Sequence, residues 1–248
     1  MPYAGLTERT LRCRSGVFER TVWSLVPPTV GPTAAILFLD GELYLERVGA
    51  AAVVRRLQER RAIPPAVAVF LSGGGAAARH EDFVCRPDYA RFIAGDLVDS
   101  VRKEHPGVTE IALAGLSLSG LAAAYAATRH PAVFRAAVCQ SPSFWWDRGR
   151  FAEELPAATQ GGPKFWISVG SWETEAGVSH PPSGLRQELT QVAGSFSAVA
   201  ALQAKGYSVS YREYDGGHDP ECWHDDLPLA LPWAWGGGDH PAAGALLH

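Results

Sequence analysis

Short apolar runs alternate with longer helix-like stretches along this sequence of 248 residues, and this alternation restricts its fold more than any other feature. The helix-like stretches lie at 50–61, 87–104, 118–128 and 184–205. Most of the apolar runs lack polar interruptions, as strands buried on both faces of a parallel sheet require. These runs occupy residues 34–39, 66–71, 111–114, 136–139, 165–169 and 207–214. The pattern predicts an α/β fold with a mostly parallel, doubly wound sheet and helices on both faces.

The same pattern continues along the chain without an internal repeat or a linker. We therefore expect one α/β domain over residues 1–232. The looser alternation of residues 11–26 could add antiparallel strands at the N-terminal edge of the sheet. Residues 233–248 are Gly-rich and without periodicity, and we expect them to form a mobile C-terminal tail.

Charge and composition restrict the partners. The chain has 22 Lys and Arg against 26 Asp and Glu, so it offers no broad cationic surface for nucleic acid or anionic lipid. No run of about 18 apolar residues predicts a membrane span, and the N-terminus lacks an apolar signal segment. We expect a cytoplasmic protein that binds neither nucleic acid nor membrane. The sequence carries no signal for oligomeric state.

Cysteine and histidine spacing gives no support for a metal or cofactor. The four cysteines, Cys13, Cys85, Cys139 and Cys222, form no CxxC pair, and no HExxH motif is present. Cys139 falls in an apolar run and is expected to be a core residue. We expect no metal and no cofactor.

A candidate nucleophile lies between an apolar run and an Ala-rich stretch. In EIALAGLSLSGLAAAYAATRHP, residues 110–131, Ser117 stands where a nucleophile elbow would place it between strand and helix. Gly115 provides the small residue that the turn needs two positions earlier, whereas Ser119 replaces the usual glycine two positions later. The alternative is an ordinary strand-to-helix turn with a capping serine.

A candidate base and acid follow Ser117 in chain order. His218 comes after the last apolar run, where catalytic groups gather at the carboxyl ends of parallel strands. Glu173 and Glu175 follow the run KFWISV. We favour Glu173 as the carboxylate that orients the imidazole, and Glu175 is the alternative. If neither has a catalytic role, the two belong to a solvated acidic loop. The remaining histidines are expected at the surface: His80, His105, His130, His180, His224, His240 and His248.

Five segments, in the same order, resemble the enterochelin esterases and related esterases of the α/β-hydrolase superfamily. They are ILFLDGE (36–42), RHEDFVCRPDYARFIAGDL (79–97), AGLSLSGLAA, CQSPSFWW (139–146) and GGHDPECWHDDLPLAL (216–231). The resemblance implies an α/β-hydrolase fold, with Ser117 attacking an ester and His218 acting as general base and then acid. It places Glu173 near the acid position of the family. It also implies an oxyanion hole made by backbone N–H groups of Leu118 and of the Asp40-Gly41-Glu42 loop.

The resemblance further implies residues that bind substrate. Arg79 would face electron-rich catecholate groups, although it could instead tether its own loop through Glu81 or Asp82. Trp145, Trp146 and Trp223 could line an aromatic cleft or could pack in the core. Cys85 and Cys222 fall within matching segments and could form a disulfide or remain thiols. Pro142 and His224 depart from the residues usual in the family.

The leading hypothesis is a serine carboxylic-ester hydrolase that acts on a small-molecule ester, siderophore-like or aromatic. One alternative is an acyltransferase of the same fold, in which an alcohol replaces water. Another is a catalytically silent module that binds a ligand in the same cleft.

Overall fold

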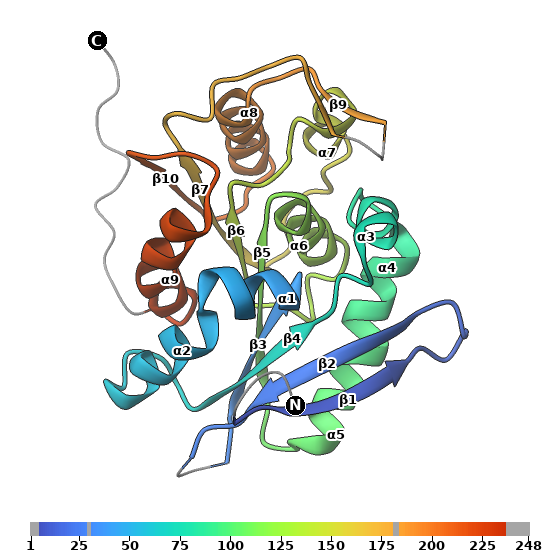
Figure 1. Ribbon diagram of the computed structural model, residues 1–248, viewed down its shortest axis with the longest axis vertical. Coiled ribbons are helices and arrows are strands. Elements are labelled where there is room, and N and C mark those ends of the chain that lie inside the picture. Colours follow the sequence, from blue (N-terminus) through green and yellow to red (C-terminus); the bar gives the residue numbers. More distant parts are fainter. Residues whose placement is uncertain (1–4, 29–30, 181–183, 237–248) are drawn as a thin grey trace.

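The computed structural model describes residues 5–28, 31–180 and 184–236, and an eight-stranded sheet runs through its centre (Figure 1). The strand order is β1-β2-β4-β3-β5-β6-β7-β10. Strand β2 pairs antiparallel with β1 and β4, and every other pairing in this sheet is parallel. The strands are β1 Thr7–Arg12, β2 Glu19–Leu25, β3 Ala34–Leu39, β4 Ala66–Leu71, β5 Glu110–Leu116, β6 Ala136–Gln140, β7 Lys164–Gly170 and β10 Val209–Tyr214.

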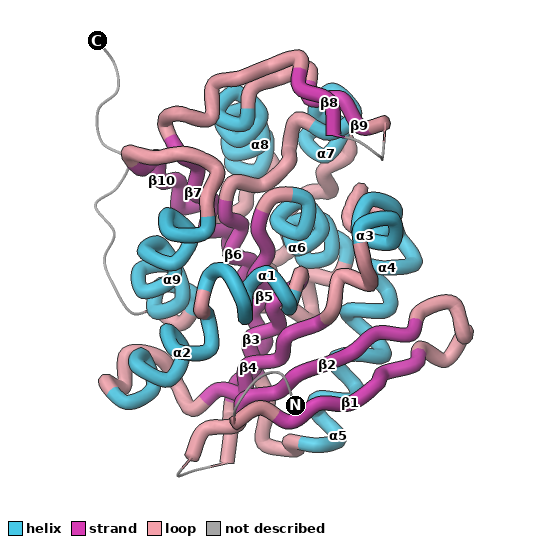
Figure 2. The backbone as a smooth tube through the Cα atoms, in the orientation of Figure 1, coloured by secondary structure: helices cyan, strands magenta, loops and turns pink. Residues whose placement is uncertain are grey.

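Helices cover both faces of the sheet, which runs between them as the magenta layer in Figure 2. One face packs against α2 (Ala50–Glu59) and α9 (Pro220–Ala234). The other packs against α4 (Pro87–Phe92), α5 (Val98–Glu104), α6 (Leu118–Arg129) and α8 (Gln191–Ala204). Shorter helical elements are α1 (Gly41–Leu43), α3 (Ala76–Asp82), α7 (Arg150–Glu153), π-helical turns at Tyr44–Val48 and Ile93–Leu97, and a 3-10 turn at Trp146–Gly149.

Burial on both faces explains why the central strands are apolar at every position. Along β3, Ile36 and Phe38 join the core beneath α2 and α9, whereas Leu37 and Leu39 join the core beneath α4 to α6. Successive side chains of a strand point to opposite faces, so a strand covered on both sides needs no polar positions. The prediction of a doubly wound, mostly parallel sheet is confirmed, and so are antiparallel strands near the N-terminus.

One predicted helix is wrong in its first part. Residues 184–205 were expected to be helical, but Leu185–Gln187 form strand β9, which pairs antiparallel with β8 (Val178–His180) outside the main sheet. Helix α8 begins only at Gln191, because Thr190 caps it by accepting a hydrogen bond from the Ala193 N–H at 3.0 Å.

The C-terminal helix extends past the expected end of the domain. Helix α9 continues to Ala234, which is fully buried, so the first residues of the expected tail belong to the packed structure. The rest of that tail, from residue 237 to 248, lies outside the described residues. In the described part of the chain, no helix is both long and apolar enough to cross a membrane.

Candidate active site

Ser117 occupies the sharp turn between β5 and α6. Its backbone has φ 54° and ψ −123°, a conformation that is strained for a residue with a side chain. A Cβ atom on Gly115 would lie 2.1 Å from the Ser119 carbonyl oxygen, so this turn requires glycine there. Ser119 is fully buried, and its hydroxyl donates to the Leu116 carbonyl at 2.7 Å and accepts from the Leu116 N–H at 2.9 Å. The serine that replaces the usual glycine therefore bonds the two sides of the turn together.

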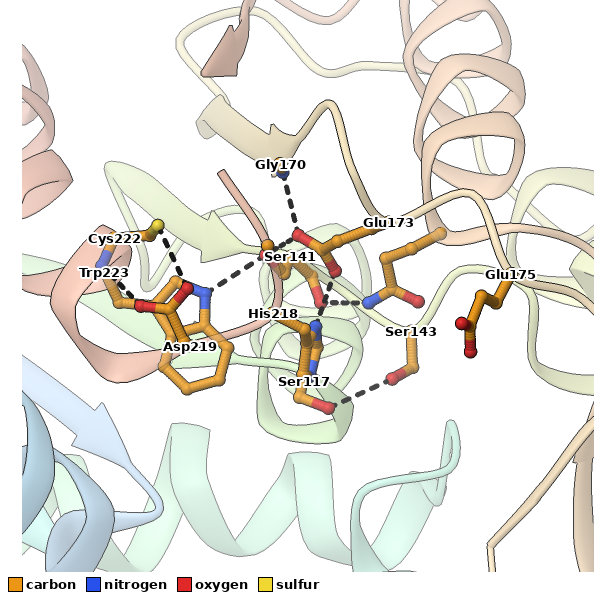
Figure 3. Close-up of polar contacts among 12 residues, drawn as sticks. Ser117, Ser141, Ser143, Gly170, Glu173, Glu175, His218, Asp219, Cys222 and Trp223 are labelled. Atoms are coloured by element: carbon orange, nitrogen blue, oxygen red, sulfur yellow. Dashed lines mark hydrogen bonds and ion pairs between the residues drawn. The ribbon is translucent and has the colours of Figure 1, made fainter. Parts of the chain in front are cut away.

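His218 lies between β10 and α9 and contacts a carboxylate from another loop. Its Nδ1 is 2.6 Å from Oε2 of Glu173, and Figure 3 draws this contact as a dashed line. A carboxylate only accepts hydrogen bonds, so Nδ1 is the donor in this contact and Nε2 is the nitrogen free to face the cavity. The Trp223 ring lies edge-on to the imidazole with its centroid 4.9 Å away. Asp219, the next residue, caps α9 by accepting from the Glu221 and Cys222 N–H groups.

The carboxylate of Glu173 is buried, and hydrogen bonds fix its second oxygen, Oε1. Oε1 accepts from the Gly170 N–H at 2.8 Å and from the Ser141 hydroxyl at 2.6 Å. Ser141 in turn lies 2.9 Å from the Tyr214 hydroxyl and accepts from Nε1 of Trp223 at 3.1 Å. Burial, opposed by the hydrogen bond to Ser141, raises the pKa of Tyr214, which keeps that hydroxyl protonated. Oε2 is thus left to face the imidazole.

A cavity of about 310 Å³ brings the candidate catalytic side chains together. Ser117, Glu173 and His218 all contribute to its lining, as do Glu175 and Trp145. The Ser117 hydroxyl is 3.5 Å from that of Ser143. Further lining residues, which the sequence did not indicate, are Ser143, Trp172, Val178, His180, Gln187 and Gln191.

His180, which was expected at the surface, is half-buried and lines the cavity. Its ring stacks on Trp145 with centroids 5.1 Å apart and an interplanar angle of 9°. The antiparallel pair β8–β9 forms this wall of the cavity. No signal in the sequence identified the wall, because its strands are three residues each and β9 fell within a predicted helix.

Arg79 is engaged elsewhere. Its Nε donates to Asp40 Oδ2 at 2.7 Å, and its guanidinium lies 5.7 Å from the centroid of the Phe83 ring. The partner is therefore neither Glu81 nor Asp82. Burial raises the pKa of Asp40, and the positive charge of Arg79 opposes that rise. Among the described residues that line the cavity, Arg79 is absent.

Two of the three tryptophans are also outside that lining. Trp223 is buried and contacts His218 rather than the cavity, and Trp146 packs beside Arg150. Of the residues proposed as an aromatic cleft, only Trp145 reaches it.

The expected oxyanion-hole residues lie at the carboxyl ends of adjacent strands. Leu118 is the first residue of α6, so its N–H has no intrahelical partner. Gly41 follows β3, which pairs with β5, and an added Cβ there would lie 2.9 Å from the backbone of Phe70. The Glu42 carboxylate accepts from the Gly73 N–H at 3.0 Å and so fixes this loop against the end of β4. The described cavity lining includes none of Leu118, Gly41 and Glu42.

All four cysteines are free thiols, so Cys85 and Cys222 do not form a disulfide. Cys139 is fully buried in β6, as expected of a core residue. Burial is the main cause that raises the pKa of Cys85 to about 12. Among the residues described, no group of three or more His, Cys, Asp or Glu is arranged to hold a metal ion.

Comparison with known proteins identifies the family of this chain. Residues 19–234 match the model of the family described as putative esterase. The iron(III) enterobactin esterase of Escherichia coli K12 is 27% identical over 231 residues, which cover 88% of this chain and 54% of that protein. The chain thus spans about half the length of the curated relatives it matches.

Solved structures share the fold. The enterobactin esterase from Shigella flexneri, in the presence of enterobactin, superposes with a TM-score of 0.79 at 24% identity, over 93% of this chain and 59% of that one. A ferulic acid esterase gives a TM-score of 0.71 at 18% identity, over 92% of this chain and 97% of that one. With the family model matching most of its length, this chain of α/β-hydrolase fold belongs to the putative esterase family.

Proposed function

We propose that this protein is a serine carboxylic-ester hydrolase in which Ser117 is the nucleophile, His218 the general base and acid, and Glu173 the orienting carboxylate. The observation that carries the proposal is the 2.6 Å contact between Nδ1 of His218 and Glu173, in the same cavity as the strained Ser117. The relatives named above are esterases of enterobactin and ferulic acid, which supports a small-molecule ester, siderophore-like or aromatic, as the substrate.

The geometry suggests the following steps. Glu173 holds His218 with Nε2 unprotonated, and Nε2 takes the proton of Ser117 as its Oγ attacks the ester carbonyl. The negative charge of the tetrahedral intermediate is stabilised by the N–H of Leu118 and by one from Gly41 or Glu42, each such donor contributing about 3 kcal/mol. The imidazolium then protonates the departing alcohol. Water, deprotonated by His218, then attacks the acyl-enzyme. As the second tetrahedral intermediate collapses, the imidazolium returns the proton to the Ser117 oxygen and the carboxylic acid leaves.

Hydrolysis of p-nitrophenyl esters and labelling by a fluorophosphonate probe test this proposal. We expect wild type to turn over the ester and to be labelled at Ser117, whereas Ser117→Ala should lose both. Ser143→Ala is the matched control, because this serine lies 3.5 Å from Ser117 and its loss should leave the Ser117 label in place. A wild-type protein with neither turnover nor label, or a label that persists in Ser117→Ala, would rule the proposal out.

A further inference from the structure

The cavity beside Ser117 has an uneven charge distribution. Its described lining contains two carboxylates, Glu173 and Glu175, but neither Lys nor Arg. Glu173 is buried and committed to His218. Glu175 is exposed, and it takes part in none of the ion pairs formed between described residues. In Figure 3 its carboxylate lies beyond Ser143, without a dashed line to any neighbour.

Basic side chains on the flanking segments do not compensate for this charge. Val178 and Gln187, which pair across β8 and β9, line the cavity, so the side chain of Arg186 points to the opposite face of this antiparallel pair. Arg148 is bound to Glu188, with 3.0 Å between Nε and Oε2. Arg79 is bound to Asp40. Of the two carboxylates in the described lining, Glu175 is therefore the one without an ion-pair partner among the described residues.

The remaining walls suit a flat ring. Trp172 is 68% exposed at the cavity, whereas Trp145 is 3% exposed and has one face covered by the parallel ring of His180. Aromatic faces attract both other rings and cations. A volume of about 310 Å³ is at the lower end of ligand pockets, which hold roughly 300–1,000 Å³, and it fits a single ring better than a large multi-ring complex.

From these observations we propose, on the basis of the esterase function above, that the cavity selects uncharged and cationic aromatic esters over anionic ones, with Glu175 as the residue that determines this specificity. An iron-loaded catecholate carries net negative charge and would meet Glu175 with no Lys or Arg in the described lining to offset the repulsion. An uncharged ring can pack against the exposed Trp172, and a cation gains the attraction of both Glu175 and that aromatic face.

The test uses p-nitrophenyl phenylpropanoates whose ring carries a para carboxylate, carboxamide or trimethylammonium group. The common leaving group keeps chemical reactivity constant, and a second series of benzyl butyrates places the same groups on the alcohol side. Assays at about pH 8 lie above the ordinary titration range of histidine. Active enzyme is counted by fluorophosphonate titration, so a misfolded variant does not distort the rates.

We expect kcat/KM for the cationic ester to exceed that for the anionic one by about tenfold in at least one series, given a few-fold effect for each exposed charge pair. Glu175→Gln should reduce this ratio to within about twofold, and salt should weaken it in wild type. Glu153→Gln removes an exposed carboxylate from α7 and should keep the wild-type ratio. A ratio near one in both series, a preference for the anion, or an unchanged ratio in Glu175→Gln would overturn the proposal. If wild type hydrolysed none of these esters, the esterase function itself would be refuted.

Discussion

The two oxygens of Glu173 have different roles. Oε1 is fixed by the Gly170 N–H and the Ser141 hydroxyl, so Oε2 is directed at His218. In Glu173→Gln, an amide can present N–H to Nδ1 and stabilise the wrong tautomer of the imidazole. We expect kcat to fall by about 10³- to 10⁴-fold, as when the acid of a Ser-His-Asp triad is replaced by its amide.

Comparison with Glu175→Gln checks this assignment, measured on an uncharged p-nitrophenyl ester. That variant should lose less than about tenfold, because Glu175 does not contact His218 among the described interactions. If Glu175→Gln proved the more damaging change, the acid would be misassigned. If neither variant lost more than about tenfold, the site would be a Ser/His pair.

We expect Ser141 to act as a positioning residue for Glu173. Its hydroxyl is fully buried, donates to Glu173, and is within hydrogen-bonding distance of Tyr214 and Trp223. A hydrogen bond to a charged group contributes about 1.5–3 kcal/mol, so Ser141→Ala should lower kcat by about tenfold or more and leave KM nearly unchanged.

Steady-state kinetics on titrated active sites measure this effect. Ser195→Ala is the matched control: this serine on α8 is equally buried, and its hydroxyl has no hydrogen-bond partner among the described residues. Equal losses in the two variants would show that Ser141 has only a packing role.

At the scale of elements, the turn between β5 and α6 brings the backbone of Gly115 close to the backbone of Ser119. A Cβ on Gly115 would lie 2.1 Å from the carbonyl oxygen of Ser119, and backbone atoms on both sides of the turn cannot move apart without opening it. We expect Gly115→Ala to lower the free energy of unfolding by about 3 kcal/mol and to abolish fluorophosphonate labelling of Ser117.

Gly95→Ala provides the comparison for this prediction. Gly95 lies in the π-helical turn between α4 and α5, and an added Cβ meets nothing within 4 Å. Alanine there should be neutral or stabilising by up to about 1 kcal/mol. Urea denaturation measures both variants, and similar midpoints would contradict the steric argument.

The strands and the site differ in how much of them the sequence predicts. Strands β3 and β4 match residues 34–39 and 66–71 because burial on both faces leaves uninterrupted apolar runs. The candidates Ser117, Glu173 and His218 were found from the sequence because nucleophile, acid and base follow one another in this order, each after an apolar run. Ser141 was not foreseen, because a serine after an apolar run has no signature of its own. The bond from Arg79 to Asp40 spans 39 positions in sequence and depends on how two loops pack.

Across the whole molecule, several buried titratable groups lie away from the candidate site, although Tyr214 lies beside it. The candidate catalytic side chains follow β5, β7 and β10, at the carboxyl ends of the parallel strands. Thiols and phenols with raised pKa values belong to both core layers: Tyr44 lies beneath α2 and α9, whereas Tyr89 and Cys85 lie on the opposite face. In each, burial is the main cause and favours the protonated form.

The free energy of unfolding should therefore decrease at alkaline pH. The contribution of Cys85 to this decrease can be measured by mutation. Below its ordinary pKa of 9.0 the thiol is protonated in both folded and unfolded chains. Between 9.0 and about 12 the unfolded chain releases the proton while the folded chain keeps it. This linkage should lower the free energy of unfolding by about 1 kcal/mol per pH unit over that range.

Urea denaturation measures the contribution of the Cys85 thiol when wild type is compared with Cys85→Ala, in reductant, at several pH values from 8 to about 10.5. The tyrosines titrate alike in both proteins, so their effect cancels in the comparison. The advantage of wild type over Cys85→Ala should be constant up to about pH 9 and then decline. Val84→Ala, a neighbouring change without a titratable group, should differ from wild type by the same amount throughout. A wild-type advantage over Cys85→Ala that does not change with pH would mean that the Cys85 thiol is solvated and titrates normally in the folded protein.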